Sequence, residues 1–151
     1  MDLVEEQLRN SKTIAVVGLS DNPDRDSHRV SKYMQSQGYR IIPVNPMIQE
    51  TLGEKSYPDL KSIPDPIDMV DIFRNSEAAG PITDEAIAAG AKVVWMQLGV
   101  RNDAAAARAE TAGLTVIMNR CPKIEFGRLS SEIGWMGIDT GVISSKRRRG
   151  L

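Results

Sequence analysis

Cysteine is nearly absent from this sequence of 151 residues, in which Cys121 is the only one. A single cysteine excludes a disulfide within the chain and a metal site built from several cysteines, and it fits a reducing compartment. Charge of one sign is also missing, because the formal net charge is −1. No overall field therefore attracts nucleic acid or an anionic membrane. We therefore expect a cytoplasmic protein, and the sequence leaves any protein partner open.

Long apolar runs are missing as well. Eighteen uncharged apolar residues never follow one another, and residues 1–8 lack the apolar segment of an export signal, so we expect neither a membrane span nor secretion. Residues 146–149 form a basic run that nucleic acid or lipid could contact, but a solvated tail is the favoured interpretation. The composition, with 41% hydrophobic and 26% charged residues, is typical of one globular domain.

Short apolar runs alternate with amphipathic segments along most of the chain. The runs that predict strands are residues 13–17, 39–44, 68–73, 92–96 and 114–118. Such alternation is typical of an α/β fold, so we expect a Rossmann-like, doubly wound parallel sheet of about five strands with helices on both faces. We expect this domain to span residues 1–128, and an arm with the basic tail to occupy residues 129–151.

The loop after the first predicted strand is rich in groups that bind anions. Gly18 permits a sharp turn, and Ser20, Arg25 and Ser27 bring two hydroxyls and a guanidinium to the same loop. The next helix is expected to begin near Asp26 or Ser27, with one of these side chains as its cap and its positive end toward the loop. The loop predicts a phosphate site; the alternative is an ordinary turn with an exposed arginine.

Polar and turn residues follow the other predicted strands too. In open α/β sheets, ligands bind beyond the carboxyl ends of the strands, so we expect these residues to line one site. Each of them alone also has an ordinary explanation as a turn or cap residue. They are Val44, Asn45 and Pro46 after the second strand, Phe73 and Arg74 after the third, Gln97 and Gly99 after the fourth, and residues 119–122 after the fifth.

This rim does not match an NAD site. The NAD fingerprint requires three spaced glycines and an acid at the end of the second strand. Gly18 is the only one of the three glycines present, because Ser20 and Pro23 occupy the other two positions, and no acid ends the second strand. These departures favour a nucleotide with an additional phosphate, for which Arg25 is a suitable partner.

Five short motifs follow one another along the chain. They are Gly-Leu-Ser with Pro23-x-Arg25-x-Ser27, Pro43-Val-Asn-Pro46, Val70-Asp-Ile-Phe-Arg74, Trp95-Met-Gln-Leu-Gly-Val100 and Arg120-Cys-Pro122. In this order the chain resembles the small bacterial and archaeal CoA-binding proteins, which are similar to the N-terminal CoA-binding domain of succinyl-CoA synthetase α subunits. The resemblance covers about residues 3–128. It implies a Rossmann-type domain with coenzyme A lying across the strand ends.

The resemblance also implies where each part of coenzyme A would lie. It places the diphosphate near Gly18 and Ser20 and the adenine side near residues 44–46. The pantetheine arm would then be bordered by Phe73, Arg74 and residues 97–99.

One position departs from the family pattern, because Asn119 stands where family members usually have aspartate. If that acid orients Arg120 or has a chemical role, this chain has lost it. If it only caps a turn, asparagine serves equally well.

Candidates for catalysis are few. A ligase of the succinyl-CoA synthetase type relies on a phosphorylated histidine, and His28 is the only histidine here; its place on the surface of a helix favours a structural role. Cys121, beside Arg120 and Lys123, is either a packing residue or a thiol that exchanges with coenzyme A. We expect a non-catalytic module that binds CoA or acyl-CoA. The alternative is an enzyme, either a nucleotide-dependent oxidoreductase or a detached acyl-CoA ligase subunit.

Overall fold

The computed structural model describes residues 3–132. The elements follow in the order α1 (Leu3–Asn10), β1 (Thr13–Val17), α2 (Asp26–Ser36), β2 (Arg40–Val44), β3 (Glu50–Thr51), β4 (Glu54–Lys55), the 3-10 helix η1 (Leu60–Ser62), β5 (Met69–Ile72), α3 (Ser76–Ala88), β6 (Val93–Met96), α4 (Asp103–Thr111), β7 (Thr115–Ile117) and α5 (Pro122–Glu132). Within this part of the chain, no helix has the length and apolar character needed to cross a bilayer.

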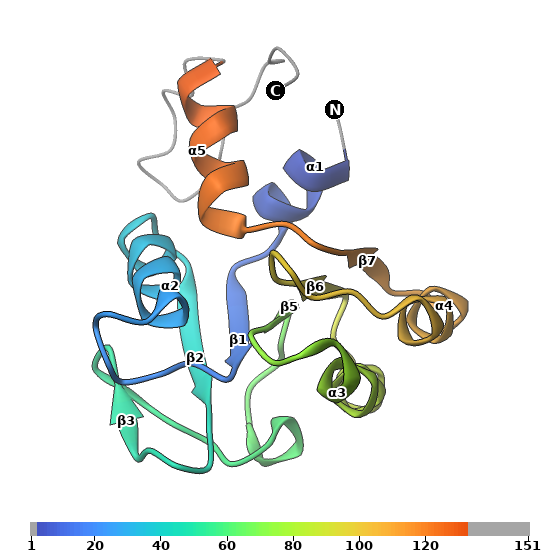
Figure 1. Cartoon of the computed structure of the whole chain (residues 1–151), viewed down its shortest axis with the longest axis horizontal. Helices are drawn as coiled ribbons and strands as arrows, with labels where there is room; N and C mark the ends of the chain where they lie inside the picture. Colours follow the sequence, from blue (N-terminus) through green and yellow to red (C-terminus); the bar gives the residue numbers. More distant parts are fainter. Residues whose placement is uncertain (1–2, 133–151) are drawn as a thin grey trace.

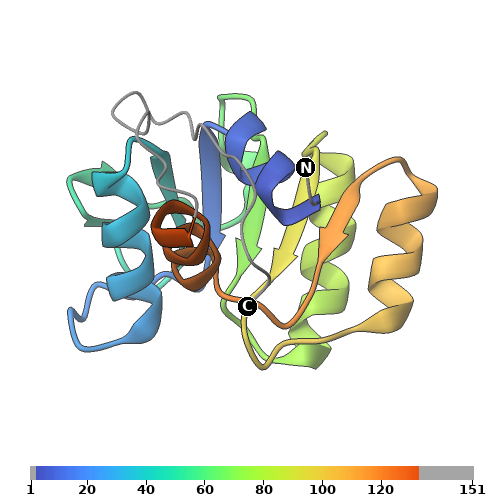
Figure 2. The ribbon, with the colours of Figure 1, turned by 90° about the horizontal axis from the view of Figure 1, so that it is seen from above.

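Five strands form one parallel sheet in the order β2-β1-β5-β6-β7. The chain moves outward from β1 to β2 and then returns to β5 on the other side of β1, so the winding direction reverses between β1 and β5. Figure 2 shows the arrowheads of the strands pointing toward the same edge of the sheet. The predicted Rossmann-like α/β fold with a five-stranded parallel sheet is confirmed.

Helices cover both faces of the sheet, so its strands are buried on both sides (Figure 1). In β1, Ile14 and Val16 belong to the core cluster that includes residues of α1, α2 and α5, whereas Ala15 and Val17 belong to the cluster that includes residues of α3 and α4. Burial on both faces explains why the parallel strands appear in the sequence as continuous apolar runs.

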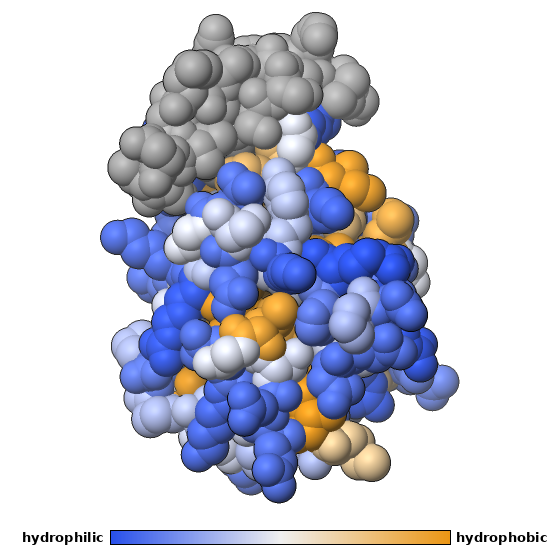
Figure 3. Space-filling view, turned by 90° about the vertical axis from the view of Figure 1, so that its left-hand side faces the viewer, coloured by the Kyte–Doolittle hydropathy of each residue, from blue (hydrophilic) through white to orange (hydrophobic). Residues whose placement is uncertain are grey.

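Helix α2 is amphipathic and directs one stripe of side chains at the sheet. Val30 and Met34 of this stripe are buried. Figure 3 shows the side of the molecule that carries α2, where hydrophilic residues predominate around a few apolar patches. Gly38 follows the helix with a positive φ of 103° and ends it.

Two features were not anticipated from the sequence. The connection between β2 and β5 contains the short β3–β4 hairpin and η1. Helix α5 continues to Glu132 and packs against α1 and α2, so the expected boundary after residue 128 falls within a helix. The basic run at residues 146–149, and residues 133–151 of the expected arm, lie outside the described residues.

Candidate functional site

The loops after β1 and β5 meet at the point where the winding reverses. Gly18 follows β1 with a φ of +92°, and a Cβ atom at this position would lie 2.5 Å from the carbonyl oxygen of Phe73. Glycine is therefore required here by both backbone conformation and space. The crevice beyond such a reversal point is where open α/β sheets bind their ligands.

The loop after β1 is held in place by its own polar groups. The Ser20 N–H donates to Ser27 Oγ at 3.0 Å, and Ser20 Oγ accepts a hydrogen bond from the Asn22 N–H at 3.0 Å. His28 Nδ1 donates to the Ser20 carbonyl oxygen at 3.0 Å. The sequence analysis placed His28 on the surface of the helix, but the residue is buried. The geometry gives His28 the role of fixing this loop.

Helix α2 begins at Asp26, as predicted, but the predicted cap is wrong. The N-cap residue is Arg25, and within residues 3–132 its side chain makes no capping hydrogen bond. The Ser27 hydroxyl accepts a hydrogen bond from the Ser20 N–H, and the Asp26 carboxylate pairs with Arg29. The N-terminal end of α2 therefore has no cap from its N-cap side chain, and a helix end of this kind can bind an anion.

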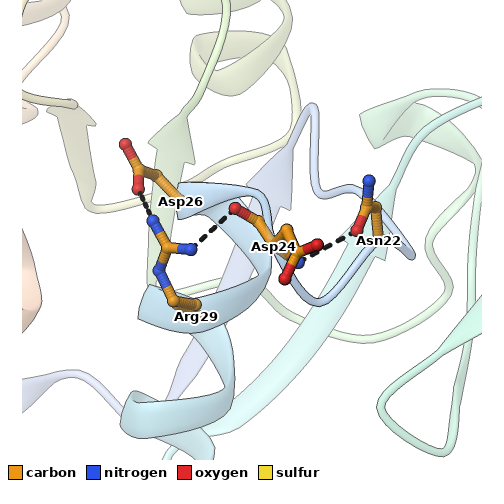
Figure 4. A network of polar contacts seen from close by, with 4 residues as sticks. All are labelled: Asn22, Asp24, Asp26 and Arg29. Carbon is orange, nitrogen blue, oxygen red and sulfur yellow. Dashed lines mark hydrogen bonds and ion pairs between the residues drawn. The ribbon is translucent and has the colours of Figure 1, made fainter.

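Arg29 ties the start of α2 to the preceding loop (Figure 4). Its guanidinium pairs with the Asp26 carboxylate and donates to the Asp24 carbonyl oxygen at 2.7 Å. The Asp24 N–H in turn donates to Asn22 Oδ1 at 2.9 Å. Because Arg29 offsets the charge of Asp26, less negative charge opposes an anion at this end of the helix.

Three adjoining grooves run along the carboxyl ends of the strands, with volumes of about 530, 590 and 390 Å3. The first and second grooves share Gly18 and Asn45 as lining residues. The second and third share Asp26 and Phe73. Because neighbouring grooves share lining residues, the three lie next to one another along the rim.

The first groove lies at the end of β2. Asn45 Nδ2 donates to the Leu19 carbonyl oxygen at 3.0 Å, and its Oδ1 accepts from the Met47 N–H at 2.9 Å, so Asn45 joins the loops after β1 and β2. Arg74 lines this groove, whereas the sequence placed it beside the pantetheine arm. The predicted lining residues are Val44, Asn45 and Pro46; those missed by the sequence analysis include Met47, Asp59, Leu60, Ile82 and Glu85.

The second groove contains the polar residues of the loop after β1. Its lining includes Gly18, Ser20, Arg25 and Ser27, the four residues of this loop that the sequence analysis proposed as a phosphate site. Arg25 is exposed and is the one cation among the lining residues. Arg25 and the uncapped end of α2 thus face the same groove.

The third groove lies between the loops after β5, β6 and β7. Gln97 and Cys121 line it, and each is only 7% exposed. Among the described residues, Gln97 Oε1 has no hydrogen-bond partner. Leu98 and Ile124 add exposed apolar surface to its wall.

Two of the predicted site residues, Pro23 and Gly99, line none of these three grooves. The Gly99 N–H donates to Asn119 Oδ1 at 2.6 Å, and Asn119 has a φ of +59°. Asparagine tolerates this left-handed conformation better than most residues. In this chain Asn119 therefore joins two loops of the rim, which is the turn role that asparagine can fill in place of aspartate.

Sequence reasoning assigned no role to Asp71, which lies inside the central strand β5. The residue is almost completely buried, and within the described part of the chain its Oδ1 has no hydrogen-bond partner. Burial raises the pKa of the Asp71 carboxyl well above its usual value, because the charged form is poorly solvated. The signal in the sequence was an acid within an apolar strand run.

Comparisons with known proteins identify a family. Residues 12–127 match the family described as CoA binding domain. The uncharacterized protein YneT of Bacillus subtilis (strain 168) is 50% identical over 121 residues, which cover 80% of this chain and 90% of that protein. The structure of a hypothetical protein from Pyrococcus horikoshii OT3 has a TM-score of 0.80 and 42% identity, and the match covers 83% of this chain and 88% of that one.

A partial match concerns a known enzyme. The α subunit of acetate–CoA ligase (ADP-forming) II from Pyrococcus furiosus is 36% identical over 61 residues, which are 40% of this chain and 13% of that subunit.

Proposed function

The chain belongs to the CoA-binding domain family, and on this premise we propose that it binds coenzyme A, free or acylated, along the three grooves of the rim. The observation that carries this proposal is that three neighbouring grooves lie along the rim, where an extended ligand could span them. In the proposed orientation, the adenosine end occupies the first groove, the diphosphate the second and the pantetheine arm the third.

The start of α2 and Arg25 bring positive charge to the second groove, which is also lined by Asp24 and by Asp26, the latter paired with Arg29. The N-terminal end of α2 carries partial positive charge and has no side-chain cap within the described residues. Arg25 adds a full positive charge at the same place. Charge-assisted hydrogen bonds of this kind are among the stronger polar contacts in proteins.

The first groove suits the phosphorylated adenosine end. Val44, Leu60 and Ile82 supply apolar walls that a base can pack against. Arg74 is the one cation among the lining residues, and we propose that it faces the 3′-phosphate. This phosphate distinguishes coenzyme A from NAD.

The third groove suits the pantetheine arm, which alternates methylene groups with amides. Leu98 and Ile124 offer apolar contact to the methylene groups. Gln97 Oε1, which lacks a hydrogen-bond partner among the described residues, would accept a hydrogen bond from an amide N–H. A buried acceptor left without a donor is costly, so the ligand would stabilise this side chain.

We propose a binding module of the cytoplasm rather than a complete enzyme. The second candidate, a subunit of an acyl-CoA ligase, is favoured by the partial match to the Pyrococcus furiosus ligase subunit. Such a subunit requires a partner chain, so affinity purification of the tagged protein from its own host separates the two candidates. Recovery of a ligase chain in stoichiometric amount supports the subunit, and recovery of the protein alone supports the module.

Calorimetric titration with coenzyme A, dephospho-CoA, acetyl-CoA and NAD tests the proposal. Coenzyme A should bind more tightly than dephospho-CoA, because only the former offers the 3′-phosphate to Arg74. Acetyl-CoA should bind about as tightly as coenzyme A if the thiol end of the third groove is open. NAD should bind most weakly, since Ser20 and Pro23 replace two glycines of its fingerprint. Tighter binding of NAD than of coenzyme A would restore the oxidoreductase alternative.

Arg25→Ala tests the diphosphate site. The substitution should weaken binding of coenzyme A by about 1–3 kcal/mol, the usual effect of losing a charge-assisted hydrogen bond, and should leave the melting temperature unchanged. Arg40→Ala is the matched control. Arg40 is the first residue of β2, so it lies at the opposite end of the strands from the grooves, where it pairs with Asp65 at 2.7 Å. Equal affinities of Arg25→Ala and the parent protein would remove Arg25 from the site.

A further inference from the structure

The third groove contains a thiol for which the proposed function has no use. Cys121 directly precedes α5, and its carbonyl oxygen accepts a hydrogen bond from the Glu125 N–H at 2.9 Å. The preceding residue is held as well, because Trp95 Nε1 donates to the Arg120 carbonyl oxygen at 2.9 Å. The backbone around the thiol is therefore fixed from two sides.

Gln97 is a second feature of this end of the groove that is consistent with a ligand. Gln97 is 93% buried, and its Oε1 has no hydrogen-bond partner in the described part of the chain. It lines the same groove as Cys121. A donor group brought into this groove would satisfy Gln97, and the rest of the same ligand would then lie against Cys121.

We propose that Cys121 forms a reversible mixed disulfide with coenzyme A, an inference that rests on the proposed function. The co-reactant is a disulfide of coenzyme A, such as the symmetrical CoA disulfide. The Cys121 thiolate attacks the disulfide sulfur that lies in the third groove, so the bond between Cys121 Sγ and that sulfur forms while the original sulfur–sulfur bond breaks. The second coenzyme A leaves as a thiolate and takes up the proton that Cys121 lost. Cys121 is oxidised, the departing coenzyme A is reduced, and no external oxidant is needed.

The burial of Cys121 makes this reaction selective. The side chain is only 7% exposed, but it lines the third groove. A disulfide in bulk solvent reaches such a thiol poorly, whereas a disulfide whose nucleotide end occupies the first two grooves is delivered to it. The coenzyme would then be held covalently under oxidising conditions and released by reducing ones.

The test measures the rate of adduct formation by intact-mass spectrometry. The full chain is incubated separately with CoA disulfide and with oxidised glutathione at equal concentration. An adduct of one coenzyme A should form at least about ten times faster than the glutathione adduct, and dithiothreitol should reverse it. Cys121→Ser should form neither adduct, because Cys121 is the only cysteine in the chain. Equal rates with the two disulfides, or no adduct with CoA disulfide, would overturn the inference.

Two further measurements separate this inference from the proposed function. The first is calorimetric titration of the parent protein with reduced coenzyme A, which reports binding without any disulfide. Arg25→Ala should slow the reaction with CoA disulfide but not the reaction with oxidised glutathione. If reduced coenzyme A binds and no adduct forms, the disulfide is refuted while the binding module stands. If reduced coenzyme A does not bind at all, both are refuted.

Discussion

Gly18→Ala should abolish binding of coenzyme A and lower the free energy of unfolding by about 2–5 kcal/mol, the sum of left-handed strain and overpacking. The strain arises because the φ of Gly18 is +92°, a value that residues with a Cβ rarely adopt. The overpacking arises because the new methyl group would lie 2.5 Å from the Phe73 carbonyl oxygen.

The surroundings of Gly18 have little freedom to relax. The atom in conflict belongs to the backbone, and the Phe73 N–H donates to the Val17 carbonyl oxygen at 2.8 Å. The Gly18 N–H donates to the Val44 carbonyl oxygen at 2.9 Å. Relief of the clash would therefore separate β1 from β5 or β2 at the place where the first two grooves share a wall.

Gly113→Ala is the matched control. Gly113 has a φ of +95°, but among the described residues nothing lies within 4 Å of a Cβ built there. It follows α4 and lines none of the three grooves. This variant should lose only the conformational part, about 1–2 kcal/mol, and should bind coenzyme A normally. Denaturant unfolding and calorimetry measure both quantities, and equal destabilisation by the two substitutions would contradict the steric account.

The strands of the sheet were predictable because burial on both faces leaves a simple signal. The predicted strand at residues 13–17 coincides with β1, and the other four runs contain β2, β5, β6 and β7 with an error of at most one residue at either end. The strands β3 and β4 were not predicted. With two residues each, they are too short to produce a periodic pattern.

The gathering of the candidate site residues at one rim was predictable from the sequence, and the groove that each side chain lines was less so. Parallel strands bring their carboxyl ends together, so residues that follow them in sequence meet at one rim. The direction of each side chain was not predictable in the same way. Arg74 and Phe73 are neighbours after β5, yet Arg74 lines the first groove, whereas Phe73 lines the second and third. The predicted helix cap was wrong because Arg25 is the N-cap residue and the Ser27 hydroxyl accepts a hydrogen bond from the Ser20 N–H of the preceding loop.

The buried polar groups of the sheet were the hardest to interpret. An aspartate in an apolar run marked Asp71 as unusual, but it did not indicate that Oδ1 would lack a partner among the described residues. Burial depends on contacts between α2, α5 and the sheet, which are distant in sequence. The same limit applies to Gln97, whose motif suggested a loop at the rim and not a buried acceptor.

Trp95 supports both the core and the third groove, so its replacement should have large effects on each. Trp95 lies in β6 opposite Asp71 and Ile117 and is completely buried. Trp95→Ala should lower the free energy of unfolding by about 3–5 kcal/mol, the usual cost of removing a buried aromatic side chain. It also removes the hydrogen bond from Nε1 to the Arg120 carbonyl oxygen, which fixes the residue before Cys121.

Trp95→Phe separates these two contributions. Phenylalanine keeps an aromatic ring in the core but cannot donate to the Arg120 carbonyl oxygen, so the variant should be less destabilised than Trp95→Ala and should still have a looser loop at the third groove. Binding of coenzyme A should weaken modestly, and the Cys121 thiol should react faster with oxidised glutathione because its burial is relaxed. Denaturant unfolding gives the stabilities, and intact-mass kinetics gives the thiol reactivity. If Trp95→Phe left the glutathione rate unchanged, the indole hydrogen bond would have no part in shielding Cys121, and Trp95 would serve the core alone.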